Sequence, residues 1–131
     1  MSQENVELAR QMIACVNRGD DEGLAALMAD DVKCFPGAGQ PESPFQGREQ
    51  FLQYARSWTD AFDKYAVESS QYVDAGEYVV ISGRTVARGR ESGVELSSDD
   101  AWVVRCRKGQ AIEYREYETR QEALDAVGLS E

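Results

Sequence analysis

The apolar residues at the start of the chain follow a helical pattern. They recur every three or four residues, at Val6, Ala9, Ile13 and Val16. This spacing predicts an amphipathic helix from residue 3 to residue 18. Gly19 is a typical residue just after a helix C-terminus, and Asp20 is a typical N-cap. We therefore expect a second, shorter helix, so that the two form a tight hairpin.

The middle of the chain changes from a short strand to a loop and then to a long helix. Residues 32–35 are typical of a brief strand, and all three prolines follow between positions 36 and 44. This loop is either a mobile lid at a pocket or a plain surface connection. Large apolar residues at helical spacing then predict a helix over 48–63 with an aromatic face.

Alternation of apolar and polar residues marks the second half of the chain. Four alternating runs cover residues 65–74, 78–88, 94–107 and 110–118. Short glycine-containing turns separate them, which predicts an antiparallel meander. Thr119 and Glu122 have capping-box spacing, so we expect a short helix to close the chain.

Composition limits the partners and the location of the protein. With 131 residues and apolar residues spread throughout, we expect one domain over 1–131. The net charge of −10 and the scattered Lys and Arg residues argue against nucleic-acid and membrane partners. No apolar run approaches the about 20 residues of a membrane span, and the three widely spaced cysteines do not suggest disulfides. We therefore expect a cytoplasmic protein.

The chain contains no histidine. Histidine is the commonest general base and the commonest metal ligand in proteins, so catalysis here would have to use carboxylates, tyrosines or arginine. The sequence also has no glycine-rich phosphate cradle. We therefore expect neither a metal nor an organic cofactor.

Alternation within the strands indicates which polar residues face inward. Asp100 shares a strand face with Trp102 and Val104, and Glu116 shares one with Tyr114. Both carboxylates thus lie on faces that are otherwise apolar, which makes them candidate pocket residues.

The run at 78–88 is apolar on both faces, so both faces of this strand need cover. The helices can cover one face. A second copy of the chain would cover the other most simply, which predicts a two-fold homodimer through the sheet face. The alternative is a monomer whose own loops cover it.

Four short motifs carry a resemblance to a known family. They are Asn17-Arg18-Gly19-Asp20, Ala29-Asp30-Asp31-Val32, Phe45-Gln46-Gly47-Arg48 and the ending from Tyr114 to Leu124. Over essentially its whole length the chain resembles SnoaL-like proteins of the nuclear transport factor 2-like superfamily. The resemblance implies an α+β, cystatin-like cone in which three N-terminal helices pack on a curved antiparallel sheet, with a short C-terminal helix.

The resemblance does not by itself fix a reaction. The superfamily includes isomerases, dehydratases, epoxide hydrolases, polyketide cyclases and proteins that only bind or scaffold. Ketosteroid isomerase-like members use an Asp, a Tyr and a second Asp at the positions where this chain has Phe35, Met12 and Trp102. Dehydratase and dehydrochlorinase members use a histidine base. The residues of this chain support neither chemistry.

Limonene epoxide hydrolase is similar in fold and places an Arg between two Asp residues. Arg84 matches the Arg and Glu116 matches one carboxylate, whereas Val86 occupies the other carboxylate position. Asp100, on the neighbouring strand, is the candidate replacement. The resemblance thus suggests a catalytic group in which Glu116 is the base, Arg84 orients or neutralises it, and Asp100 is the acid.

Three functions are open at this point. The protein binds a small apolar, polyketide-like or terpene-like molecule; or it is an acid–base enzyme (epoxide hydrolase, lyase, isomerase or cyclase) that uses the three charged residues; or it is a dimeric scaffold whose cone is filled. A paired internal charge cluster fits binding as well as catalysis. For a pocket, the expected lining is Met12, Phe35, Phe51, Tyr54, Trp58, Phe62, Val86, Trp102, Val104 and Tyr114.

Overall fold

The computed structural model describes residues 2–37 and 44–129. Its elements are α1 (Ser2–Arg18), α2 (Asp21–Ala26), β1 (Met28–Phe35), β2 (Phe45–Gln46), α3 (Arg48–Ala61), β3 (Phe62–Ala75), β4 (Tyr78–Gly89), β5 (Glu95–Arg107), β6 (Gln110–Tyr117) and α4 (Arg120–Ala126). The helical hairpin, the long third helix, the meander and the terminal helix are confirmed. None of the described helices combines the length and the apolar composition needed to cross a membrane. Most of the expected lid loop, at 38–43, lies outside the described residues.

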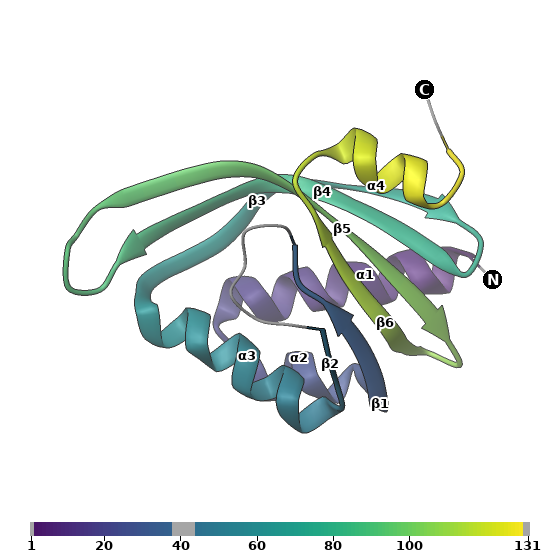
Figure 1. The fold of residues 1–131 in the computed structure, drawn as a ribbon, viewed down its shortest axis with the longest axis horizontal. Helices are drawn as coiled ribbons and strands as arrows, with labels where there is room; N and C mark the ends of the chain where they lie inside the picture. Colours follow the sequence, from purple (N-terminus) through teal and green to yellow (C-terminus); the bar gives the residue numbers. More distant parts are fainter. Residues whose placement is uncertain (1, 38–43, 130–131) are drawn as a thin grey trace.

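The strands form one curved, six-stranded sheet in the order β2-β1-β6-β5-β4-β3 (Figure 1). β3 to β6 are the predicted antiparallel meander. The prediction of a fully antiparallel sheet is wrong, because β1 runs parallel to β6. A parallel pair needs a long connection, and here α3 and most of the meander provide it. β1 and β2 also separate α2 from α3, so the first three helices do not form one N-terminal block.

β1 is longer than the sequence predicted. It begins at Met28 and continues through Asp30 and Asp31, which are typical of a turn. Its pairing with β6 shifts register between Met28 and Lys33, and both aspartates are exposed there. The turn signal thus marks a real irregularity, but the strand continues through it.

The main core lies between the sheet and the helices α1, α2 and α3. Its fully buried side chains come from the inner strands and include Met28, Val32, Cys34, Val79, Ile81 and Val104. α1 packs mainly on β3, and α3 packs on β1 and β3. Burial of one such aliphatic side chain stabilises a fold by about 1.5–3 kcal/mol, so this core fixes the helices over one face of the sheet.

α4 lies on the opposite face of the sheet (Figure 1). Its residues Ala123 and Leu124 pack on Val80, Ala101 and Val103, and all five are buried. The predicted capping box begins this helix. The second apolar face of β4 is therefore covered, over this part, by the chain itself.

The motif at residues 17–20 joins α1, α2 and β3. The Asn17 amide donates to the Val67 carbonyl (3.1 Å) and accepts from the Val67 N–H (2.8 Å). β3 is an edge strand, so this amide satisfies two buried backbone groups that have no further strand beside them. Gly19 follows α1 with a φ of 68°, and Asp20 caps α2. The motif is thus a clamp between the helices and the sheet edge.

We expect Asn17→Ala to lower the free energy of unfolding by about 1–3 kcal/mol, because the buried N–H and C=O of Val67 lose their partner. Glu7→Ala, at an exposed position on the same helix, should change it by less than about 0.5 kcal/mol. Urea denaturation followed by circular dichroism measures both values. Equal effects of the two substitutions would mean that the clamp contributes nothing to stability.

The homodimer stays a prediction. If a second copy pairs through the outer sheet face, sedimentation equilibrium at micromolar concentration gives about twice the 14.6 kDa of one chain. Val86→Glu, which adds a charge to this face beyond α4, should then return the mass to that of one chain. A mass near one chain for the unsubstituted protein would remove the homodimer.

Candidate functional site

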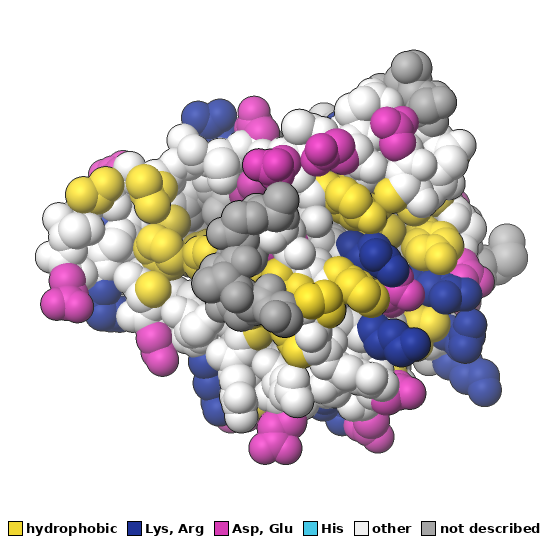
Figure 2. Space-filling view, viewed as in Figure 1, with side chains coloured by type: hydrophobic (Ala, Val, Ile, Leu, Met, Phe, Trp, Pro, Cys, Tyr) yellow, Lys and Arg dark blue, Asp and Glu magenta, His cyan; other side chains and the backbone are white. Residues whose placement is uncertain are grey.

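A pocket of about 440 Å³ opens between the C-terminal end of α3, the start of β3 and the inner face of β4 to β6. We call it the main pocket. The long β4–β5 hairpin, which supplies part of its lining, projects past the C-terminal end of α3 (Figure 1). Figure 2 shows hydrophobic side chains gathered on the same, left-hand side of the molecule. The described lining consists of Gly37, Trp58, Phe62, Tyr65, Thr85, Ala87, Leu96, Ser97, Ser98, Asp100, Trp102, Glu116, Tyr117 and Glu118.

Three aromatic rings form one wall of the main pocket. The ring centroids of Trp58 and Phe62 lie 5.7 Å apart with nearly parallel planes, and each ring lies 5.8 Å from the ring of Tyr65. Phe62 is already the first residue of β3, because α3 ends at Ala61. The turn from helix to strand therefore brings the three rings together.

Two smaller chambers continue the main pocket toward the core. Each has a volume of about 70 Å³. The first shares Trp58, Tyr65 and Glu116 with the main pocket, and the second shares Tyr65 and Trp102. The interior is therefore hollow near the β4–β5 hairpin and almost filled by side chains closer to α1.

Glu116 borders both the main pocket and the first chamber, and three donors hold its carboxylate. The hydroxyls of Tyr54 and Tyr114 donate to Oε2 at 2.8 and 2.7 Å, and the Gly37 N–H donates to Oε1 at 3.1 Å. A Cβ at position 37 would lie 3.3 Å from the Glu116 Cβ, so glycine allows this close approach. A carboxylate has about four acceptor sites, and these bonds occupy three of them. They therefore fix Glu116 in place.

The tyrosines near Glu116 remain protonated at neutral pH. Burial, followed by the charge of Glu116 and by Tyr54, raises the pKa of Tyr114 well above its ordinary value. Burial also raises the pKa of Tyr65, and the charges of Glu116 and Asp100 raise it further. Both hydroxyls are therefore neutral, and two carboxylates act on Tyr65 at once.

Asp100 and Thr85 supply polar atoms on the sheet side of the main pocket. The Ser98 hydroxyl donates to Asp100 Oδ2 at 2.9 Å, and Asp100 is only partly buried. Thr85 is 7% exposed, and its hydroxyl oxygen has no hydrogen-bond partner in the described part of the chain. A buried polar atom without a partner costs about 1–3 kcal/mol, so it marks a position where a ligand can bind.

Arg84 lies on the opposite face of the sheet from Asp100 and Glu116. β4 and β5 pair Gly83 with Asp100. The next pair of residues, Arg84 and Asp99, points outward because side chains alternate between the two faces. The guanidinium lies 3.6 Å from the Asp99 carboxylate, and 55% of the Arg84 side chain is exposed. The strand register thus separates Arg84 from the two carboxylates, which do meet at one pocket.

The expected lining residues divide into two groups. Those at the main pocket or its chambers are Met12, Phe51, Tyr54, Trp58, Phe62, Trp102 and Tyr114. The other three lie elsewhere. Val86 points to the outer face, Val104 is fully buried in the core, and the Phe35 ring lies 3.9 Å from the Arg115 guanidinium on the outer side. Val86 and Phe35 each lie next to an inward-facing residue of the same strand, so each prediction is wrong by one position.

Gly37, Tyr65 and Thr85 line the main pocket but were not predicted from the sequence. Tyr65 pairs with Ala87, and Val67, two residues further along β3, pairs with Thr85. The alternation that singled out Asp100 could have identified Tyr65, since it shares the inward face with Val67. Gly37 gives no such signal, because it follows a proline in a loop.

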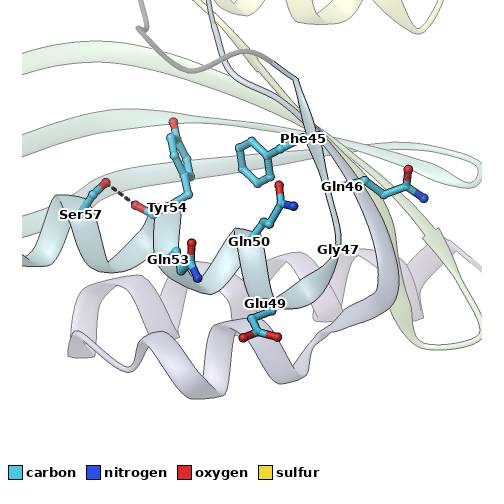
Figure 3. Close-up of a pocket in the computed structure, with 8 residues that line it drawn as sticks. All are labelled: Phe45, Gln46, Gly47, Glu49, Gln50, Gln53, Tyr54 and Ser57. Carbon is cyan, nitrogen blue, oxygen red and sulfur yellow. Dashed lines mark hydrogen bonds between the residues drawn. The ribbon is translucent and has the colours of Figure 1, made fainter.

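A second, wider hollow lies beside β2 and α3 (Figure 3). It measures about 770 Å³, is open to solvent, and is lined by Phe45, Gln46, Gly47, Glu49, Gln50, Gln53, Tyr54 and Ser57. Most of these side chains are exposed. Tyr54 is the link to the site described above, since its hydroxyl donates to Glu116. Because this hollow gathers one carboxylate and no unpartnered buried atom among the described residues, the main pocket is the better candidate site.

Metal and thiol chemistry find little support in the described residues. They contain no group of three or more His, Cys, Asp or Glu side chains placed to hold a metal ion. The thiols of Cys15, Cys34 and Cys106 are buried and form no disulfide. Burial and the charge of Glu116 raise the pKa of Cys34 to about 12, and burial raises that of Cys106 to about 11. These two thiols therefore stay protonated and unreactive.

Comparison with known proteins places this geometry in a family. The model of the SnoaL-like domain matches residues 9–114, which is most of the chain. No curated protein is significantly similar in sequence. The match ends two residues before Glu116, so it includes the wall formed by α3 and β3 as well as Asp100.

Solved structures share the fold over almost the whole chain. A proposed polyketide cyclase from Xanthomonas campestris pv. campestris has a TM-score of 0.80 at 20% identity, covering 97% of this chain and 98% of that one. A nuclear transport factor 2-like protein of unknown function from Burkholderia pseudomallei has 0.79 at 17%, covering 95% and 98%. A protein with a ketosteroid isomerase-like fold from Catenulispora acidiphila, in complex with trimethylamine, has 0.77 at 18%, covering 94% and 93%. At these identities the likeness shows the fold alone.

We expect Tyr54→Phe and Tyr114→Phe each to lower the free energy of unfolding by about 1.5–3 kcal/mol, because each removes a hydrogen bond to a charged carboxylate. Tyr78→Phe is the control, since no hydrogen bond of the Tyr78 hydroxyl is found in the described part of the chain, and it should change stability by less than about 0.5 kcal/mol. Guanidinium chloride denaturation measures all three. If the first two variants were as stable as the control, the tyrosines would not hold Glu116.

Proposed function

The chain belongs to the SnoaL-like domain family, and we propose that it binds a small molecule with an apolar body in the main pocket. The observation that carries this proposal is the pocket itself. Its volume of about 440 Å³ exceeds the lower end of about 300 Å³ for small-ligand pockets. A scaffold with a filled cone would not need this space, so binding is the better explanation.

The lining of the main pocket fits such a ligand. The rings of Trp58, Phe62 and Tyr65 offer a continuous apolar wall, which favours an apolar body by burial of its surface. Asp100 and the unpartnered Thr85 hydroxyl offer a few polar atoms on the other side. Ligand pockets commonly combine apolar walls with a small number of placed polar groups.

Acid–base catalysis is the second candidate function. It is favoured by Tyr65, which lines the main pocket together with Asp100 and Glu116. Burial and the charges of both carboxylates raise the pKa of Tyr65, so its hydroxyl is protonated. Two features favour binding over catalysis. Arg84 lies outside the pocket, so it cannot support the proposed base, and three donors already hold Glu116. An enzyme would therefore have to rely on Asp100 and Tyr65.

Two structurally similar proteins support a small-molecule role. One is the proposed polyketide cyclase from X. campestris, and the other is the C. acidiphila protein in complex with trimethylamine. The name of the first implies a polyketide ligand, and the second holds an amine. Both kinds of ligand are compatible with a pocket of this size.

The uncharged fluorescent probe N-phenyl-1-naphthylamine tests the proposal. Ala87 lines the main pocket, whereas its neighbour Val86 points to the outer face. We expect Ala87→Phe to fill the pocket and to lower the probe's affinity at least about tenfold, which corresponds to about 1.4 kcal/mol. Val86→Phe adds the same ring outside the pocket and should leave the affinity unchanged.

The two tryptophans of the chain, Trp58 and Trp102, both line the main pocket. Quenching of tryptophan fluorescence therefore reports binding independently of the probe's own signal. Failure of the unsubstituted protein to bind the probe, or equal loss in both Phe variants, would contradict binding in this pocket.

A further inference from the structure

We propose that the ligand of the main pocket is a protonated amine with an apolar body. This inference rests on the proposed function and adds the charge and the chemical class of the ligand. The acidic pocket lining, the aromatic wall and the unpartnered Thr85 hydroxyl support such a ligand.

The charged residues of the main pocket are all acidic. Its described lining contains Asp100, Glu116 and Glu118 and no Lys or Arg. Arg84, which adjoins Thr85 on β4, points outward. Low-dielectric walls strengthen the field of charges that line a cleft, so an anionic ligand is repelled from this pocket and a cationic one is attracted.

The aromatic wall favours a cation over a neutral ligand of the same shape. A cation over the face of Trp, Tyr or Phe gains about 0.5–2 kcal/mol. Trp58 and Phe62 are stacked on each other and both lie against the ring of Tyr65, so the outer faces of this cluster can contact a cation. Asp100 and Trp102 lie on the sheet side of the same pocket. A cation between them would thus have rings on one side and a carboxylate on the other.

The polar atoms suggest an ammonium group that carries N–H. The Thr85 hydroxyl, 7% exposed, has no hydrogen-bond partner among the described residues. Asp100 accepts one hydrogen bond, from Ser98, and a carboxylate has about four acceptor sites. An amine N–H could therefore bond to Asp100 or to Thr85, whereas a quaternary ammonium would leave the Thr85 hydroxyl without a partner.

The state of Tyr65 is consistent with a negative potential inside the pocket. The charges of Glu116 and Asp100 both add to the effect of burial on the pKa of this hydroxyl. A bound cation would reduce that effect. A volume of about 440 Å³ leaves room for an apolar body beyond the amine, which the chambers toward the core could extend.

Three ligands of similar size and different charge test the inference: benzylamine, benzyl alcohol and benzoate. At neutral pH the first is a cation, the second is neutral and the third is an anion. We expect the full-length protein to bind benzylamine at least about tenfold more tightly than benzyl alcohol, and benzoate more weakly than both. Titration of tryptophan fluorescence, checked by calorimetry, measures the three dissociation constants.

Two variants that each remove one negative charge show which carboxylate attracts the amine. Asp100→Asn should reduce the preference for the amine over the alcohol to less than about threefold, because it removes the carboxylate beside the ligand. Asp99→Asn changes the net charge equally, but Asp99 points outward and 88% of its side chain is exposed, so the preference should persist.

Thr85→Val should weaken amine binding about two- to tenfold through the lost hydrogen bond. Thermal melting checks that each variant is folded.

Ionic strength gives a test that needs no substitution. Raising it about tenfold should weaken benzylamine binding and leave benzyl alcohol binding nearly unchanged, since salt screens only the charged ligand.

The outcomes separate this inference from the proposed function. If benzyl alcohol binds as tightly as benzylamine and Ala87→Phe abolishes both, the pocket binds small molecules but the amine inference is overturned. Equal loss of the preference in Asp99→Asn and Asp100→Asn also overturns it, because the effect then comes from net charge alone. If none of the three ligands binds and the uncharged probe does not bind either, the result contradicts the proposed function itself.

Discussion

The pairing register of β4, β5 and β6 determines which charged residues meet in the interior. Gly83 lies opposite Asp100, and Trp102 lies opposite Glu116, so both carboxylates share one face with the aromatic residues. A slip of one residue would reverse every side chain of a strand. It would bring Asp99 to the pocket in place of Asp100. The acidic, aromatic pocket is therefore a consequence of the register as much as of the residues.

The edge strand β3 completes the pocket because it can lie close to β4. A Cβ at Gly83 would lie 2.7 Å from the Val67 side chain and 3.1 Å from the Glu68 carbonyl oxygen, so a side chain there would push the two strands apart. β3 also shifts register between Glu68 and Gln71. The Asn17 amide holds the same stretch from the helical side. Together these contacts position the start of β3, and with it Tyr65.

Much of the architecture follows from local sequence patterns. Helical spacing gave α1 and α3, alternation gave the meander, and the capping box gave the start of α4. The direction of β1 could not be predicted in this way, because it depends on a partner, β6, that lies about eighty residues further along the chain. Local periodicity carries no information on such a pairing.

The site was partly predictable, and the failure at Arg84 has a physical cause. Residues 79–81 are apolar and buried on both faces, since the helices cover one side and α4 covers the other. Such a stretch cannot reveal which face is inward. The assignment of Arg84 then depended on a family resemblance and not on alternation. Asp100 and Glu116 were found because each alternates with residues, Trp102 and Tyr114, whose inward direction is unambiguous.

The acidity of the chain has two physical roles that a count of charges cannot separate. Most of the described carboxylates are exposed, as Asp99 is, and water and salt screen their fields. Asp100 and Glu116 instead border an aromatic wall, where burial raises the pKa of Tyr65 and the charges of both carboxylates raise it further. A net charge of −10 favours solubility. In our proposal, selectivity for a ligand's charge comes from the few carboxylates that the sheet turns inward, because their field is screened less than that of exposed carboxylates.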